Sequence, residues 1–513
     1  CFCLGFRWAQ SWHQSARKSF DHFSRKKMTS FLAWALAILL AVSAAPVADA
    51  LDGDAPMRSS AQFLASKETY EAIAIVAKAL QSGANSSRNF IARQEALQTR
   101  LRPLFRALPK TAHGLLAPQT ARYALHRHFV REHSAYIHGL EPAGTSFWND
   151  SSPVRALSQH VPAHIQELFS ERLESHGGLD LNHLALFAAT LESLIHLSSF
   201  TFLREAYALT NHSTEELLTG TEIADVIARW LALFVSHSHK LDEYRTMPLQ
   251  KLAKSFPGFK SMLAFALQKH QEVLGTSDHG YSFMDVGRVV DAVVSGMGQQ
   301  QQGDCDEFTD ELIEIGVPGT GRVKLSNFFA TRLFNEPPQL LRDLGALDEE
   351  DEEGSGLHKE PHVLIANYVT SSTNCISSTN LYASCCPDAC EPLLMQLEEH
   401  FQGPMAKPED ILGFVQTMSS RTQRAPRQLG ETLVRRLQDV AEVNGGYVPL
   451  HGRLFAQWMH FAYPYECSLP ARIGTTKQVA SKDFNRLVTD MRKRFTSDHI
   501  EEYLRDHASA KDL

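Results

Sequence analysis

In Gly319-Thr-Gly-Arg-Val-Lys-Leu-Ser-Asn-Phe-Phe-Ala-Thr-Arg-Leu333, a glycine turn is followed by a short Val-x-Leu segment and by apolar residues four positions apart. A second stretch repeats this pattern, from Gly445-Gly-Tyr-Val-Pro-Leu450 to Trp458. Apolar residues four apart lie on one face of an α-helix, so each stretch predicts a turn followed by a helix. The residues before each turn, 308–315 and 429–443, also have the spacing of an amphipathic helix.

Helix, glycine turn, short extended segment and helix is the architecture of an EF-hand. Calcium binding in this architecture needs carboxylates at most of the ligand positions, a glycine at loop position six and a bidentate Glu at position twelve. With Gly321 or Gly446 at position six, position twelve is Asn327 or Gly452, and neither loop has an acid at positions one or three. The sequence therefore predicts two EF-hand-like units that do not bind calcium. Two ordinary helical hairpins with glycine turns explain the same pattern equally well.

The remaining sequence predicts a mostly α, multi-helical fold with little or no sheet. The N-terminal part reads as helical, and Thr219-Gly-Thr-Glu222 is a capping box before an apolar stripe. A glutamine run at 299–302 predicts a solvated loop, and the one convincing strand candidate is 363–369. Another stripe with helical spacing consists of Leu184, Phe187, Ala188, Leu191 and Ile195.

The composition excludes several classes of protein. The chain has 513 residues, of which 43% are apolar, so it is long enough for two to four domains and is neither disordered nor collagen-like. Lys and Arg number 50 against 58 Asp and Glu, which gives a net charge of −8 with neutral histidine. A mildly acidic chain lacks the basic surface of a nucleic-acid binder, so we expect no nucleic-acid partner.

The clearest boundary is the acidic block Asp348-Glu-Glu-Asp-Glu-Glu353, which Gly-Ser-Gly follows. Six like charges repel one another and resist packing, so the block predicts a solvated linker. We therefore divide the chain into a leader and signal peptide (1–50), an N-terminal helical domain (51–250), a helical EF-hand-like region (251–346), an acidic linker (347–361), a Cys-rich EF-hand-like region (362–470) and a C-terminal amphipathic helix (471–513).

An apolar run at 31–45 follows Met28, and Ala48-Asp49-Ala50 has the small residues of a signal cleavage site. A membrane span needs about 20 residues, and this run is shorter, so we expect a cleaved signal peptide and a secreted or endomembrane-lumenal protein. If residues 1–27 are translated, basic residues at 25–27 flank the run, and a signal-anchored membrane protein is the alternative. No later segment is expected to span a membrane.

Cleavage after residue 50 would change the charge and the cysteine count. It removes six basic and two acidic residues, which shifts the net charge from −8 to −12, and it removes Cys1 and Cys3. Glycosylation sequons begin at Asn85, Asn149 and Asn211. The cysteines that remain are an even number and predict up to three disulfides rather than a zinc site: Cys305, Cys375, Cys385, Cys386, Cys390 and Cys467.

Several motifs occur together in this chain: Arg122-Tyr-Ala-Leu-His-Arg-His128 with Gly139-Leu-Glu-Pro142, Gly319-Thr-Gly-Arg-Val323, Leu344-Gly-Ala-Leu-Asp348, Cys385-Cys386 with Cys390-Glu391, and Val448-Pro-Leu-His-Gly-Arg-Leu-Phe-Ala-Gln-Trp-Met-His460. Together they resemble a family of secretory EF-hand-like proteins of uncharacterised function from unicellular algae and related protists. The resemblance covers most of residues 100–470. It departs from the family pattern after Arg131 and in Ser468-Leu469. It implies no ligand, cofactor or reaction.

The common motifs of hydrolases, P-loop proteins and dinucleotide-binding proteins do not occur. Among the 24 histidines, His126, His128 and His133 fall in a helix predicted over 123–137, together with Glu132. His126 and His133 are seven apart and therefore share a helix face.

Zinc needs three or four converging ligands, whereas a single helix face offers two. His237 and His239 are further candidates from another part of the chain. We therefore expect no catalytic residue, no cofactor and no metal site, with His126, His128 and His133 as weak metal candidates.

These observations favour a non-enzymatic, secreted or lumenal interaction or structural protein with an unknown protein partner. Its EF-hand-like modules would act as packing units. Contact with a membrane is expected only if the signal is uncleaved. The alternative is a metal-dependent enzyme, a hydrolase or an oxidoreductase, that uses the region from His126 to His133.

Overall fold

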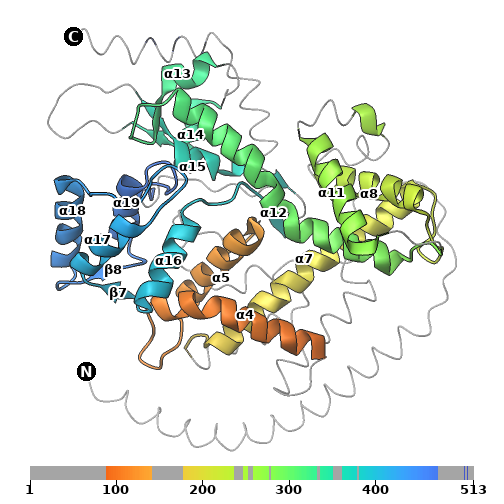
Figure 1. The fold of residues 1–513 in the computed structure, drawn as a ribbon, viewed down its shortest axis with the longest axis horizontal. Helices are drawn as coiled ribbons and strands as arrows, with labels where there is room; N and C mark the ends of the chain where they lie inside the picture. Colours follow the sequence, from red (N-terminus) through yellow and green to blue (C-terminus); the bar gives the residue numbers. More distant parts are fainter. Residues whose placement is uncertain are drawn as a thin grey trace, which may run out of the picture. The chain divides into compact units, whose positions relative to one another are not determined.

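The computed structural model describes residues 88–140, 177–235, 247–251, 258–275, 279–331, 336–349, 361–377 and 381–471, together with His499, Glu502 and Arg505. Within these ranges the fold is mostly α and multi-helical, with three small sheets, as the sequence predicts (Figure 1). The predicted signal peptide, Asn85, Asn149, His237 and His239 lie outside the described residues. Most of the predicted C-terminal helix also lies outside them.

The helices of the described part are α4 (Arg88–Ala107), α5 (Pro118–His133), α7 (Leu181–Leu209), α8 (Gly220–Val235), α11 (Phe259–Leu274), α12 (Phe283–Glu314), α13 (Leu325–Ala330), α14 (Pro338–Asp343), α15 (Ile365–Val369), α16 (Glu391–Phe401), α17 (Pro408–Thr417), α18 (Glu431–Glu442) and α19 (Arg453–Ala462). The strands are β1 (Ala135–Ile137), β2 (Arg322–Lys324), β3 (Leu347–Asp348), β4 (His362–Leu364), β5 (Ile376–Ser377), β6 (Tyr382–Ser384), β7 (Met405–Ala406) and β8 (Val448–Pro449). The antiparallel sheets have the orders β1-β6-β5, β2-β4-β3 and β7-β8.

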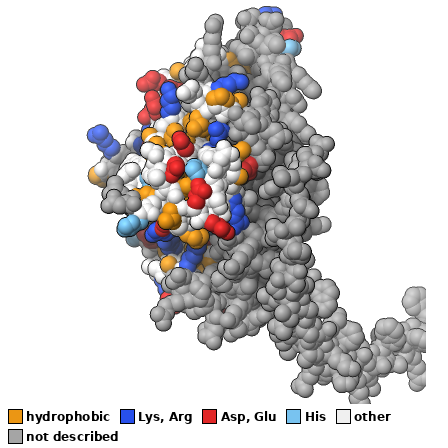
Figure 2. Space-filling view, turned by 90° about the vertical axis from the view of Figure 1, so that its right-hand side faces the viewer, with side chains coloured by type: hydrophobic (Ala, Val, Ile, Leu, Met, Phe, Trp, Pro, Cys, Tyr) orange, Lys and Arg blue, Asp and Glu red, His pale blue; other side chains and the backbone are white. Residues whose placement is uncertain are grey.

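The described part of the surface carries charges of both signs. On the face that Figure 2 shows, acidic and basic side chains alternate with apolar and uncharged ones rather than gathering by sign. Such mixing is typical of a soluble surface and produces no strong field of a single sign over that face.

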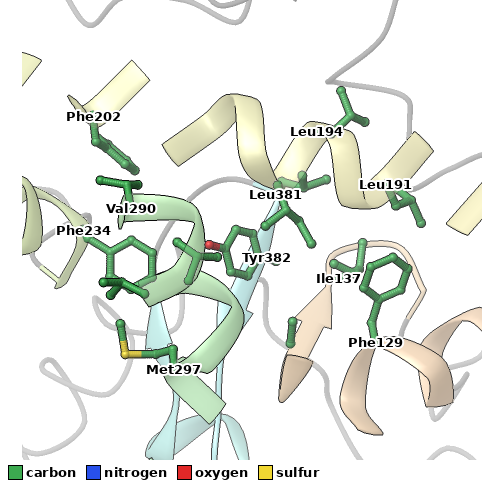
Figure 3. Close-up of a cluster of buried hydrophobic side chains, with 14 of the residues drawn as sticks. Phe129, Ile137, Leu191, Leu194, Phe202, Phe234, Val290, Met297, Leu381 and Tyr382 are labelled. Carbon is green, nitrogen blue, oxygen red and sulfur yellow. The ribbon is translucent and has the colours of Figure 1, made fainter. Parts of the chain in front are cut away.

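The largest hydrophobic core contains side chains of α4, α5, α7, α8, α11 and the first half of α12. Figure 3 shows Leu191 and Leu194 of α7 beside Leu381 and Tyr382, with Phe129 and Ile137 nearby. The apolar stripe predicted on 184–195 lies in this core, and the predicted capping box forms at the start of α8, where Thr219 and Glu222 exchange hydrogen bonds. The sequence therefore located these two helices correctly.

The helix α7 corrects one expectation. By length and composition it can cross a membrane, with a mean hydropathy of 1.4 in its most apolar window, so the prediction that no later segment has this property is wrong. In the fold, 76% of that window is buried. A helix that is apolar on most sides is buried either in lipid or in a core, and α7 packs against α4, α8 and α12.

Four antiparallel pairings join loops that each precede a helix. They link Leu116 with Leu179, Leu218 with Tyr281, Val323 with Val363, and Ala406 with Val448. Seven of these eight residues lie two positions before the first residue of a helix. The exception is Val448, since α19 begins at Arg453. The chain is therefore a series of helix–loop–helix units that are joined in pairs through their loops.

Both units predicted from the glycine turns belong to this series. The first consists of α12, β2 and α13, and the second of α18, β8 and α19. Gly321 and Gly446 have φ angles of 67° and 89°, which favour glycine. The sequence did not predict that each unit pairs with another through β4 or β7.

Two smaller cores hold the C-terminal part together. One contains Leu312, Val323 and Val363, and the other contains Leu393, Val448 and Trp458. The 32-residue α12 extends from the largest core to the first of these, as Figure 1 shows. All six predicted cysteines form disulfides, with the pairs Cys305–Cys386, Cys375–Cys385 and Cys390–Cys467.

Three local predictions differ from the structure. The glutamine run at 299–302 continues α12 instead of forming a solvated loop, because glutamine favours helix and Gln301 is buried, where it accepts a hydrogen bond from Ser384. The strand predicted at 363–369 forms only at its start, in β4, and continues as α15. The helix predicted over 123–137 ends at His133, and β1 follows. Short apolar runs do not distinguish a strand from a buried helix.

The described residues on the two sides of the acidic block pack in the same region. Its first residue, Asp348, pairs with His362, so β3 and β4 hold the two ends side by side. Leu341 before the block and Val363 after it belong to one hydrophobic cluster. The segment is thus an insertion between two paired strands, whereas the sequence suggested a linker between two domains. Like charges resist packing with one another, but they do not prevent the strands on either side of the block from pairing.

Candidate functional site

Two histidines at the C-terminal end of α5 meet a glutamate of α7. His128 and Glu192 are buried, and His133 is partly exposed at 23%. The Nε2 atom of His133 lies 3.1 Å from Glu192 Oε1, and the Nε2 atom of His128 lies 3.8 Å from the same oxygen. One ligand atom from each of the three side chains lies within 4.8 Å of the other two. Two imidazoles and a carboxylate are a set of ligands that zinc uses.

The end of α5 places His133 in this cluster. Ser134 adopts a left-handed conformation, with φ 48° and ψ 35°, and terminates the helix. Its side chain packs against Gly298 of α12, where an added Cβ would lie 2.3 Å from Ser134 Oγ. Only glycine allows this approach, so Gly298 fixes where α5 ends and where His133 lies.

Glu192 is also held by a chain of polar side chains on the opposite side. Arg93 of α4 donates to Glu192 Oε2 at 2.8 Å and to His196 Nε2 at 2.6 Å. Because arginine only donates, the Nε2 atom of His196 accepts, and its Nδ1–H donates to Asp291 at 2.7 Å. Oε1 of Glu192 therefore remains directed toward His128 and His133.

A small cavity borders the cluster. Its volume is about 20 Å³, and its lining includes His133, Glu192 and His196 beside apolar side chains such as Phe234 and Met297. This space accommodates one water molecule or one ion, because a single water needs about 10–15 Å³.

The electrostatics of the cluster favour a neutral histidine beside an ionised glutamate. Burial lowers the pKa of His128 and outweighs the attraction of Glu192. Burial alone would raise the pKa of Glu192, but its contacts with His128 and His133 and the charge of Arg93 hold it well below its usual range. Neither ring nitrogen of His128 has a hydrogen-bond partner among the described residues. Other buried polar atoms of the described residues also lack a partner, but in His128 both ring nitrogens do.

The sequence found part of this cluster and misplaced the rest. His126 does not share the cluster with His133, since its ring packs edge-to-face on Tyr136. Glu132 contacts Arg131 and Arg100 instead of a histidine. No local pattern points to Glu192, which lies far along the chain on a helix whose sequence is typical of a core helix. The only local signal is the spacing of Glu192 and His196, which puts both on one face of α7.

The residue before His128 enters a different polar cluster. Arg127 donates to both carboxylate oxygens of Glu391, at 2.7 and 2.5 Å, and also to Glu398. His451 lies beside this network, with Nε2 3.6 Å from Glu398 and Nδ1 3.3 Å from the hydroxyl of Tyr123. Burial raises the pKa of Glu398 and so favours its protonated, neutral form. With Glu398 neutral, the charge of Arg127 is balanced by the one carboxylate of Glu391. This network joins α5 to α16.

Several of the motifs noted in the sequence are partners in space. Arg127 and Glu391 belong to two separate motifs and form the pair just described. Arg322 of the Gly-Thr-Gly-Arg-Val motif pairs with Asp348 at 2.8 Å. An added Cβ on Gly321 would lie 2.1 Å from the backbone oxygen of Pro464, which follows the C-terminal motif. These motifs therefore carry packing constraints.

No protein-family model, no curated protein and no solved structure matches the chain.

Proposed function

We propose that the protein is a non-enzymatic, secreted or lumenal structural or interaction protein built from EF-hand-like units that do not bind calcium. The four loop pairings carry this proposal, because each joins two helix–loop–helix units through their loops, and seven of the eight paired residues lie two positions before a helix. Repeated units of this kind bury a core only when they pack in pairs. They act as packing modules, and their outer surfaces remain for a protein partner.

The loops lack the ligands that calcium needs. With the paired residue at position eight, the loop 211–222 is the richest in oxygen ligands, since Asn211, Glu215 and Glu222 fall at positions one, five and twelve. However, Glu222 accepts hydrogen bonds from the backbone and hydroxyl of Thr219, and Glu216 occupies position six, where calcium loops have glycine.

A calcium titration of the purified full-length chain tests this point. We expect no change in the melting temperature up to millimolar calcium. A shift at micromolar calcium that Glu222→Gln abolishes would overturn the proposal for that loop. Asn211 is exposed beside the same loop, so glycosylation there, as we propose together with Asn85 and Asn149, is compatible with a structural role.

The three disulfides support an oxidising compartment, because such bonds persist in secreted and lumenal proteins and are rare in the cytosol. We propose that the signal at 31–50 directs the chain there. Expression in eukaryotic cells should release a protein whose N-terminus lies near residue 51 and whose mass falls on enzymatic deglycosylation. A chain retained in the cytosol with free thiols would contradict this. A chain that retains residues 31–50 in the membrane fraction would favour the signal-anchored alternative.

Large apolar side chains are exposed beside the pairing of β7 with β8, which supports a protein partner. Val443 is 72% exposed and Tyr447 is 45% exposed, both in the loop before β8, and Met405 of the paired strand β7 is 44% exposed. A photo-crosslinking residue at position 443 should capture one partner in stoichiometric amounts in the native compartment. The same residue at the exposed Lys407 is the matched control. Equal or absent capture at both positions would contradict a specific partner.

The alternative function, a metal-dependent hydrolase or oxidoreductase, is favoured by the convergence of His128, His133 and Glu192. The small cavity beside them has room for one ion or one water molecule, which supports ion binding more directly than a reaction. We therefore keep the non-enzymatic function as the first proposal.

A further inference from the structure

We propose that His128, His133 and Glu192 bind one divalent transition-metal ion of the zinc class, and that this ion ties the C-terminal end of α5 to α7. The site is independent of the EF-hand-like loops. It makes no use of calcium chemistry, because imidazole nitrogen suits zinc, copper and nickel, whereas calcium takes oxygen ligands.

The distances fit a tetrahedral ion after small side-chain movements. Bonds of about 2.0–2.1 Å place neighbouring ligand atoms of a tetrahedral site about 3.3 Å apart. The two observed distances from Glu192 Oε1 are 3.1 Å to His133 and 3.8 Å to His128. All ligand atoms lie within 4.8 Å of one another, so the largest closure required is about 1.5 Å.

The hydrogen-bond inventory identifies the atoms that remain for an ion. His128 is fully buried, and both of its ring nitrogens lack a partner among the described residues. His133 Nε2 lies 3.1 Å from Glu192 Oε1 and can coordinate an ion in place of that hydrogen bond when the neutral ring carries its proton on Nδ1. His196 is excluded as a ligand, because Arg93 and Asp291 engage both of its nitrogens.

The surrounding side chains orient the three ligands and leave room for a fourth. Arg93 binds Oε2 of Glu192 and thereby orients Oε1 toward the two histidines. The small cavity at His133 and Glu192 has room for one water molecule as the fourth ligand. The cysteines of the described part are all paired in disulfides, so thiolates there do not compete for the ion.

The experiment uses the full-length chain without an affinity tag, stripped with a chelator and then titrated with Zn²⁺ or Co²⁺. We expect one ion per chain by elemental analysis, a rise in melting temperature, and a Co²⁺ absorption spectrum without a thiolate band. His128→Leu, His133→Gln and Glu192→Gln should each weaken binding more than about 100-fold, since loss of an outer-shell partner alone costs 10–100-fold. The matched control His126→Gln, on the same helix but outside the cluster, should bind normally.

The proposal is overturned if the wild-type chain binds no stoichiometric metal, or if binding survives the loss of His128 and His133. His133→Gln is the variant most tolerant of folding defects, because this side chain is the most exposed of the three. Zinc X-ray absorption on the wild-type protein needs no variant. It should show two imidazoles with oxygen ligands, and a sulfur ligand would contradict the assignment.

Discussion

Arg127 and His128 are consecutive residues of α5, yet they enter two buried clusters of opposite character. The guanidinium of Arg127 donates to Glu391 and Glu398, so its buried charge is matched within the chain. The ring of His128 is equally buried, but neither of its nitrogens has a hydrogen-bond partner among the described residues.

This difference distinguishes the Arg127 network, a structural joint between α5 and α16, from the ligand site that we propose at His128. Buried polar groups are normally satisfied, and the guanidinium of Arg127 follows that rule by donating to Glu391 and Glu398, which joins α5 to α16. Beside it, Glu398 Oε2 and His451 Nε2 have no hydrogen-bond partner among the described residues. In the cluster around His128, by contrast, both ring nitrogens lack a hydrogen-bond partner among the described residues. The side chains of His133 and Glu192, which can also bind a metal ion, lie within reach. The metal ion that we propose would complete this set of ligands.

The largest effect is expected from breaking the structural joint. Arg127→Met leaves Glu391 and Glu398 buried without their counter-charge, so the free energy of unfolding should fall by about 3–5 kcal/mol. Denaturant unfolding measures this. Arg100→Met is the control: Arg100 is 52% exposed and pairs with Glu132 at 3.6 Å, so its loss should cost less than about 1 kcal/mol. Similar losses for both variants would show that the Arg127 network is not a joint.

A loss of similar size is expected from the disulfide that anchors the same joint. Cys390 precedes Glu391 at the start of α16 and is bonded to Cys467, with a sequence separation of 77. Replacing both cysteines with serine should cost roughly 4.5 kcal/mol by the loop-entropy estimate and should leave metal binding at His128 unchanged. Unfolding and metal titration of the same sample check both expectations. Loss of metal binding in this variant would mean that the two clusters are coupled.

The pH dependence of the Arg127 network provides a third test. Burial, together with the charges of Arg127 and Lys110, lowers the pKa of His451 to about 3. The unfolded chain takes up this proton below about pH 6.5, so the stability that neutral His451 contributes is present above that pH and is lost as pH falls. Between pH 7 and 5, the wild type should lose about 2 kcal/mol more of its free energy of unfolding than His451→Gln. Parallel pH profiles of the two proteins would contradict the lowered pKa.

The smallest effect is expected at His128 in protein freed of metal. His128→Leu replaces unpartnered polar atoms with an apolar side chain of similar size, so the free energy of unfolding should change by less than about 1 kcal/mol. Denaturant unfolding in the presence of a chelator measures this. With Zn²⁺ present, the wild type should become more stable and the variant should not. A large loss in chelated protein would mean that His128 has a partner within the fold.

Much of the fold follows from local patterns in the sequence. The apolar stripe on α7, the capping box of α8 and the glycine turns at Gly321 and Gly446 all predict the elements that form. These signals are local because helix periodicity and left-handed turns depend on neighbouring residues. The other loop pairings have weaker signals. Gly114 before Leu116 and Gly177 before Leu179 repeat the Gly-x-apolar spacing, but their helices lack the Val-x-Leu echo.

The candidate site was predicted only in part, for the same reason. Helix spacing pointed to His126 and His133, whereas the structure groups His128 with His133 because Ser134 ends the helix and lets the last side chain turn. Glu192 stands 59 residues from His133, and no local pattern connects them. A site whose ligands come from two helices depends on how those helices pack.

The sequence by itself determined the mostly α class, the two glycine-turn units and the six cysteines that pair, because periodicity, turn chemistry and an even thiol count are properties of the chain alone. Only the tertiary structure decided which cysteines are bonded, which loops join, and which way Arg127 and His128 face. Those outcomes depend on contacts between distant segments, and the free energy of burying a charge or a lone pair is set by what the rest of the fold brings beside it.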